Sequence, residues 1–210
     1  MRLALLAAAA LLLATAPALA KVGPISVAAT PEGVWVGRSE GGLVRVDPAS
    51  GQITGTSDAV DIPTSLAAGL GHLWAVDARG NRIVRIGRTG AQEAARWFRG
   101  FPSAVAPGRR SLWVLLHRGP RHGRTVLLRL SPTSLRVAGS FHLGRRSVVL
   151  AAGHGTVWLS FDRRTRSGRS ALVAIDERSG RLRFRRALRG DPWGLAAGRA
   201  AVWALMGQDG

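Results

Sequence analysis

The sequence contains no cysteine and no tyrosine, and Lys21 is its only lysine. Without cysteine the protein has no disulfides and cannot be an acyl-anchored lipoprotein, so packing alone must hold the chain together. Acidic residues are scarce: 12 Asp and Glu stand against 30 Lys and Arg, which gives a formal net charge of +18. The sequence has no nucleophile elbow and no phosphate-cradling glycine loop, so it gives no support to hydrolase or nucleotide chemistry.

The first twenty residues have the pattern of an export signal. Arg2 precedes an apolar run over residues 3–13, and small residues lead to a cleavage site after Ala20. We expect residues 1–20 to be removed and residues 21–210 to fold in the periplasm, in the cell envelope or outside the cell. The apolar run is short for a membrane span and no other segment is a candidate, so we expect no transmembrane segment in the mature chain.

The excess of arginine has two explanations. A GC-rich genome favours arginine over lysine and produces the bias without any function. Alternatively, guanidinium groups form a surface that binds phosphate, sulfate or carboxylate and concentrates acidic partners. Nucleic acid is not an expected partner, because the signal peptide directs the chain out of the cytoplasm.

One unit repeats five times in the mature chain. The copies begin near residues 24, 63, 102, 147 and 192, and the last copy is incomplete. Each copy reaches a tryptophan, at intervals of 39, 39, 45 and 45 residues: Trp35, Trp74, Trp113, Trp158 and Trp203. Each full period holds four short apolar runs separated by Gly, Pro, Asp and Ser, and none has a helical period. The pattern predicts an all-β fold, a β-propeller of four-stranded blades with about four and a half blades present.

The repeat resembles a known family. The pattern Pro-x-x-Leu-Ala-Ala-Gly, then Leu-Trp-Val, then Leu-x-Arg-Ile-Asp-Pro-x-x-Gly, is represented by segments 63–69, 112–114 and, with Val in place of Ile, 43–51. It is similar to the repeat of bacterial YVTN and YncE-like propellers and of the propeller family that includes virginiamycin B lyase. The resemblance implies the fold more than the function, because such repeats are scaffold shared by proteins with different tasks.

The fifth unit stops at Gly210, after its second strand. Propellers of the resembled families have about six or seven blades, and an open one would expose two unpaired strand edges. We therefore expect this chain to be a fragment; otherwise a second copy, as a homodimer, or an unusual closure must cover the edges.

Residues that recur in every blade are interpreted as scaffold. The five tryptophans are expected to pack between neighbouring blades. Arg45, Arg85 and Arg129 recur in the third strand, where we expect each stem to lie over apolar surface with its head group in solvent.

Departures from the repeat are where function is expected. Trp113 to Leu130 and Trp158 to Ile175 are both 17 residues, against 11 and 12 in the first two units. The two insertions are rich in arginine and are predicted to be adjacent loops beside the central channel, on the face that also carries the connections between blades. Trp193, at the entry of an innermost strand, is the aromatic candidate on that face, with interblade packing as its alternative. The predicted binding residues are His117, Arg118, Arg121, His122, Arg124, Arg163, Arg164, Arg166, Arg169 and Trp193.

These observations predict a binding or interaction module for an anionic polymer or an acidic protein. One alternative is a metal-dependent lyase of the virginiamycin B type, which the resemblance implies would need a histidine general base; only His117 and His122 lie on the expected face. The other alternative is a structural envelope protein. No catalytic signature, metal-ligand spacing or cofactor motif is present, so we assign no catalytic residue, metal or cofactor.

Overall fold

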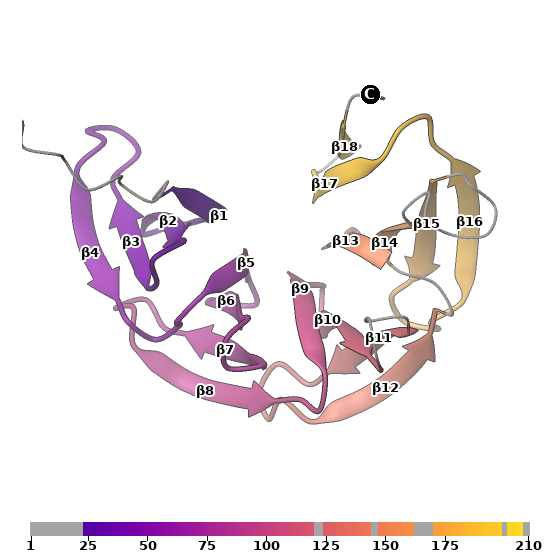
Figure 1. Cartoon of the computed structure of the whole chain (residues 1–210), viewed down its shortest axis with the longest axis horizontal. Helices are drawn as coiled ribbons and strands as arrows, with labels where there is room; N and C mark the ends of the chain where they lie inside the picture. Colours follow the sequence, from indigo (N-terminus) through magenta and orange to yellow (C-terminus); the bar gives the residue numbers. More distant parts are fainter. Residues whose placement is uncertain (1–22, 120–123, 144–146, 162–169, 199–200, 208–210) are drawn as a thin grey trace, which may run out of the picture.

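The computed structural model describes residues 23–119, 124–143, 147–161, 170–198 and 201–207. Over these residues the chain forms eighteen strands and no helix. The strands make four four-stranded antiparallel sheets and one two-stranded sheet, which follow one another around an arc (Figure 1). The first strand of each sheet lies nearest the centre of the arc and the fourth lies at its outer rim. This is the β-propeller that the repeat predicts.

Each blade is a meander in which strands pair in chain order. Blade 1 contains β1 (Pro24–Thr30), β2 (Gly33–Arg38), β3 (Leu43–Val46) and β4 (Ile53–Ser57). Blade 2 contains β5 (Pro63–Gly69), β6 (His72–Asp77), β7 (Arg82–Ile86) and β8 (Gln92–Trp97). Blade 3 contains β9 (Phe101–Pro107), β10 (Leu112–Arg118), β11 (Arg124–Leu130) and β12 (Val137–His142).

Blade 4 contains β13 (Ser147–Gly153), β14 (Thr156–Phe161), β15 (Ala171–Asp176) and β16 (Leu182–Ala187). Blade 5 contains β17 (Pro192–Ala197) and β18 (Val202–Met206). Four of the five predicted repeat starts coincide with the first residue of an innermost strand, and the third strand of this kind begins one residue earlier, at Phe101. Within the described residues no strand pairs blade 1 with blade 5, so the arc is open there (Figure 1).

The loops of each blade divide between its two ends, because neighbouring strands run in opposite directions. The turns from the first to the second strand and from the third to the fourth lie at one end, which we call the turn face; in blade 2 they are residues 70–71 and 87–91. The loops from the second to the third strand, and the connections between blades, lie at the other end, the loop face; in blade 2 they are residues 78–81 and 98–100.

Short turns on the turn face have specific backbone requirements. Leu70 and Gly71 have φ values of 56° and 79°, and His154 and Gly155 have φ values of 53° and 71°. Two consecutive residues with positive φ form the two-residue turn that matches the twist of an antiparallel hairpin. The Gly at the second position of each turn meets this requirement without strain.

The interblade role predicted for the tryptophans is confirmed for the first three. Trp35, Trp74 and Trp113 are at most 1% exposed, and each lies in a core made by its own blade and the next one. Trp158 is half-buried, and its ring lies 5.4 Å from that of Phe184 in the same blade. Trp203 is 71% exposed, because no described sheet covers its side of blade 5.

Candidate functional site

The arginine-rich insertions lie only partly within the described residues. Six of the ten predicted binding residues fall outside them: Arg121, His122, Arg163, Arg164, Arg166 and Arg169. The binding role of these six residues stays a prediction.

The interpretation of the first insertion as a loop from His117 to Arg124 is wrong. His117 and Arg118 are the last residues of β10, and Arg124 is the first residue of β11. His117 pairs with Thr125 in the sheet, and its Nδ1 lies 3.1 Å from the Thr125 Oγ1, so the imidazole is buried and only 7% exposed. The insertion therefore lengthens the hairpin, and among its described residues Arg118 and Arg124 present exposed side chains at the end of the two strands.

The central channel is lined by the innermost strands and encloses about 590 Å³. Its described lining consists of apolar, glycine, serine and threonine residues and contains no charged side chain. Trp193 is part of that lining and is 73% exposed, so its ring is not packed between blades. The use of this ring as a ligand contact stays a prediction.

A group of described arginines lies on the turn face. A groove of about 580 Å³ lies between blades 3 and 4, and we call it the 3/4 groove. Its lining consists of Arg109, Arg110, Ser111, Arg129, His154, Gly155, Asp176, Glu177, Arg178 and Arg183. Five arginines against two carboxylates leave three positive charges when His154 is neutral. The 3/4 groove is thus a basic surface on the turn face. The basic surface predicted for the loop face, most of whose arginines lie outside the described residues, stays a prediction.

Glu177 closes one side of the 3/4 groove. Its carboxylate accepts hydrogen bonds from the backbone N–H of Arg109 at 2.9 and 3.0 Å and from that of Arg110 at 3.3 Å. Its own N–H donates to the carbonyl of Gly155 at 2.9 Å. Glu177 is only 7% exposed, so it holds the two turns of the groove together and its charge is satisfied by the backbone.

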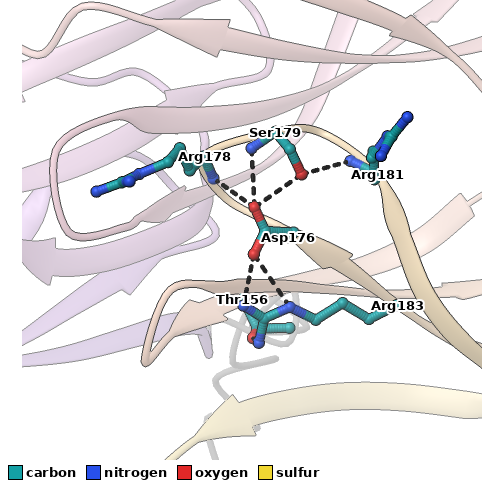
Figure 2. Close-up of polar contacts among 6 residues, drawn as sticks. All are labelled: Thr156, Asp176, Arg178, Ser179, Arg181 and Arg183. Atoms are coloured by element: carbon teal, nitrogen blue, oxygen red, sulfur yellow. Dashed lines mark hydrogen bonds and ion pairs between the residues drawn. The ribbon is translucent and has the colours of Figure 1, made fainter.

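Asp176 occupies the start of the next turn (Figure 2). One carboxylate oxygen accepts the N–H of Arg178 at 3.1 Å, and the N–H and hydroxyl of Ser179 at 2.8 Å each. The other oxygen accepts Nε of Arg183 at 3.2 Å and its Nη2 at 2.5 Å. The hydrogen bond from the Ser179 backbone, followed by that from Arg183, holds the pKa of Asp176 far below its ordinary value of 3.8.

The recurring arginines of the third strands connect successive blades. Nη1 of Arg45 donates to the carbonyl of Arg88 at 3.2 Å, and Nη1 of Arg129 donates to the carbonyl of Arg178 at 3.1 Å. Nη1 of Arg85 donates to the carbonyls of Pro132 and Thr133 at 3.0 and 3.1 Å. These head groups are partly exposed, and each also binds the outer turn of the following blade, a contact that the sequence did not predict. Blade 4 has Ala174 at this place.

Three guanidinium groups of the 3/4 groove remain available. Arg129 is bound to the Arg178 carbonyl, and Arg183 is bound to Asp176 and, at 2.6 Å, to the hydroxyl of Thr156. The guanidinium groups of Arg109, Arg110 and Arg178 make no hydrogen bond or ion pair with any part of the chain that the structure describes, and all three side chains are exposed. The groove can therefore offer charged donors to an external anion without first breaking an internal ion pair.

The equivalent groove between blades 1 and 2 provides a comparison. It encloses about 340 Å³ and has Glu32 and Arg88 where the 3/4 groove has Arg110 and Glu177. Arg88 Nε and Glu32 Oε1 lie 3.2 Å apart across it, so its charges are already paired. The 3/4 groove has an excess of positive charge that the groove between blades 1 and 2 lacks, so the repeat does not impose this excess.

A sequence signal for the 3/4 groove existed. The first turns of the first four units carry Pro31-Glu32, Leu70-Gly71, Arg109-Arg110 and His154-Gly155, so the pair of arginines in the third unit departs from its counterparts. A comparison of loop lengths among the units finds the insertions. It misses the two arginines of the third unit, because they change the residue type of the turn and not its length. The contribution of Glu177, 68 residues away from Arg109, needs the fold.

Other kinds of site have little support in the described residues. No three His, Asp or Glu side chains there lie close enough together to hold a metal ion. No described helix is long and apolar enough to cross a membrane.

Comparison with known proteins defines the class of fold. No protein-family model matches the chain, and no curated protein sequence matches it. Among solved structures it is similar to a streptogramin B lyase, with a TM-score of 0.67 and 17% identity over 88% of this chain and 62% of that one. These numbers establish a β-propeller.

Two further structures extend the comparison. Hydrazine synthase of Kuenenia stuttgartiensis has a TM-score of 0.67 and 15% identity, with 82% of this chain and 51% of that one covered. BamB from Moraxella catarrhalis has a TM-score of 0.60 and 14% identity, with 86% and 54% covered. The chain thus spans between half and two thirds of each of these proteins. At such identities the likeness shows the fold alone, and membership of the YVTN/YncE-like family stays a prediction.

Proposed function

We propose that this protein is an exported β-propeller that serves as a rigid interaction module for an anionic partner, such as an acidic polymer or an acidic protein. The observation that supports this proposal is the 3/4 groove, where Arg109, Arg110 and Arg178 present guanidinium groups that no described residue binds. Guanidinium groups form paired hydrogen bonds with carboxylate and phosphate, so the groove suits a partner that carries such groups.

The blades below the groove suit a rigid mount. Trp113 is fully buried in the core between blades 3 and 4, and Leu115, Leu127 and Leu159 surround it at 0% exposure. A close-packed core of this kind holds the turns above it in place, so a partner meets donors whose backbone is already ordered.

Export is part of the proposal and rests on residues 1–20. Expression of the full chain in a bacterium with a periplasm is expected to give a mature protein that begins at Lys21. N-terminal sequencing of the protein from the periplasmic fraction checks this, and retention of Met1 on cytoplasmic protein would contradict it.

No observation favours the lyase as a second function. The resemblance would require a histidine general base on the loop face, and the one candidate that the structure describes, His117, is buried with its Nδ1 at the Thr125 hydroxyl. The similarity to streptogramin B lyase is at 17% identity and concerns the fold.

The binding proposal is tested on the mature chain with soluble polyanions. We expect polyglutamate or polyphosphate to bind at about 20 mM salt and to be released at about 500 mM, because salt screens exposed charges over a few ångströms at the higher concentration. Fluorescence anisotropy of labelled polyanions gives the dissociation constants. Absence of binding to every polyanion at low salt, or binding that salt does not weaken, would overturn the proposal.

A further inference from the structure

The 3/4 groove has features that specify the kind of anion it binds. We propose that this groove takes a phosphate group of the partner, with Arg109, Arg110 and Arg178 as its contacts. The inference rests on the proposed function, since it names the site and the chemical group for the same anionic partner.

The three available arginines surround the groove from both sides. Arg109 and Arg110 belong to the turn between β9 and β10 in blade 3, and Arg178 belongs to the turn between β15 and β16 in blade 4. His154, on the turn between β13 and β14, completes the rim with a further ring nitrogen donor. A ligand in the groove therefore contacts cations from both blades, and neither blade alone supplies all three arginines.

The backbone that carries these arginines is fixed before a ligand arrives. Glu177 binds the N–H groups of Arg109 and Arg110, and Arg129 binds the carbonyl of Arg178. Both turns are thus held by hydrogen bonds that cross from one blade to the other. Only the arginine side chains must be ordered on binding, which lowers the entropic cost of association.

The two acidic residues of the groove do not pair with the guanidinium groups of Arg109, Arg110 or Arg178. Asp176 is bound by its own turn and by Arg183, and the carboxylate of Glu177 is directed to backbone N–H groups. An added anion therefore has no competing internal carboxylate on Arg109, Arg110 or Arg178 among the described residues. This differs from the groove between blades 1 and 2, where Glu32 already binds Arg88.

The number of donors and charges favours phosphate over carboxylate. A carboxylate has two oxygens and one negative charge, whereas a phosphate monoester has three terminal oxygens and nearly two charges at neutral pH. Three guanidinium groups and a local excess of three positive charges match the second group better, because each guanidinium can bind a separate pair of oxygen lone pairs.

Two triple variants of the mature chain test the assignment of the site. In one, Arg109, Arg110 and Arg178 become serine; in the matched control, the exposed Arg79, Arg136 and Arg185, which lie outside the groove, become serine, so both lose three charges. We expect the groove variant to bind polyphosphate at least about tenfold more weakly and the control to change less than about threefold. Circular dichroism and thermal midpoints establish that both variants are folded.

The outcomes separate this inference from the proposed function. Wild-type protein that binds no polyanion overturns the proposed function itself. If the wild-type protein binds but both variants lose affinity equally, or only the control loses affinity, the proposed function stands. Either of these results overturns the groove as the binding site.

The chemical group is tested with three probes, each applied to the wild-type chain and to the groove variant. Isothermal titration with inorganic phosphate, polyphosphate and polyglutamate is expected to show weakening by the groove substitutions for both phosphate probes. Measurable inorganic phosphate binding identifies free phosphate as a sufficient ligand, and binding of polyphosphate alone identifies a phosphate carried on a polymer. Polyglutamate that binds the groove as tightly as polyphosphate would overturn the choice of phosphate.

Discussion

The carboxylate of Glu177 in blade 4 binds the backbone N–H of Arg109 in blade 3 at 2.9 and 3.0 Å. A β-carbon at Gly108 would collide with this carboxylate, so the glycine allows the two blades to approach. The same contact has two effects. It joins the blades, and it places one negative charge beside three arginines that we assign to a ligand.

Replacing Glu177 with glutamine separates these two effects. The variant is expected to lose roughly 1–3 kcal/mol of unfolding free energy, because a buried charged acceptor of backbone hydrogen bonds is replaced by a neutral one. Its affinity for phosphate is expected to rise, because a negative charge leaves the groove. Chemical denaturation and phosphate titration measure the two effects. Glu40→Gln, on the exposed loop of blade 1, is the control, and a fall in phosphate affinity in Glu177→Gln would contradict the assignment of the groove.

Trp113→Ala is expected to destabilise the protein by about 3–5 kcal/mol, because it leaves a large cavity in the core between blades 3 and 4. Trp203→Ala removes the corresponding ring of blade 5, which is 71% exposed, and is expected to change stability by less than about 0.5 kcal/mol. Urea denaturation of the two variants gives the comparison. Equal losses of unfolding free energy in the two variants would show that burial between blades does not determine how much each tryptophan contributes to stability.

Arg129→Met tests the bridge from blade 3 to blade 4. The variant keeps most of the apolar stem but loses the hydrogen bond from Nη1 to the Arg178 carbonyl, so we expect a loss of about 1 kcal/mol. Arg136→Met, at an exposed place after the outer turn of blade 3, is the control and should have little effect. If Arg129→Met leaves the free energy of unfolding unchanged, the hydrogen bond to the Arg178 carbonyl contributes no stability beyond that of the apolar stem.

Asp176→Asn tests the acid sensitivity of the outer turn of blade 4. The pKa of Asp176 is lower in the folded chain than its ordinary value of 3.8, so its stabilising contribution is present above about pH 4 and is lost as the pH falls below it. The variant should be less stable than the wild type at pH 6, and the difference should shrink toward pH 2.5. Thermal midpoints across this range measure it, and a difference that does not change with pH would contradict the assigned contacts.

Much of the fold could be predicted because each blade repeats the same physical solution. The tryptophan period gives the blade, and residues with special turn geometry give the strand ends, as at Asp47 and Asp176, which cap equivalent turns with the same contacts to Ser50 and Ser179. The prediction of strand ends failed at the first insertion, which is rich in polar residues. His117 and Arg118 look like a loop in the sequence, but an antiparallel hairpin can grow through polar residues when their backbone groups pair and the imidazole finds a hydroxyl.

The candidate site was harder to predict because it depends on contacts between blades. Arg109 and Glu177 are 68 residues apart in the sequence, and neither residue alone shows that the carboxylate of Glu177 will bind the backbone N–H of Arg109. The recurring Arg45, Arg85 and Arg129 show the same limit, since recurrence indicates scaffold but does not reveal which carbonyl of the next blade each one binds.

The hydrogen bonds from Arg45, Arg85 and Arg129 to the following blade, which we call the arginine bridges, all point the same way along the series of blades. Each one runs from the third strand of a blade to the outer turn of the following blade, so neighbouring blades unfold as coupled units and the coupling can be counted junction by junction. The junction after blade 4 has Ala174 in place of the arginine and lacks this connection. Local opening should therefore start there, and backbone amides of β17 and β18 should exchange with deuterium well before those of β10 and β11.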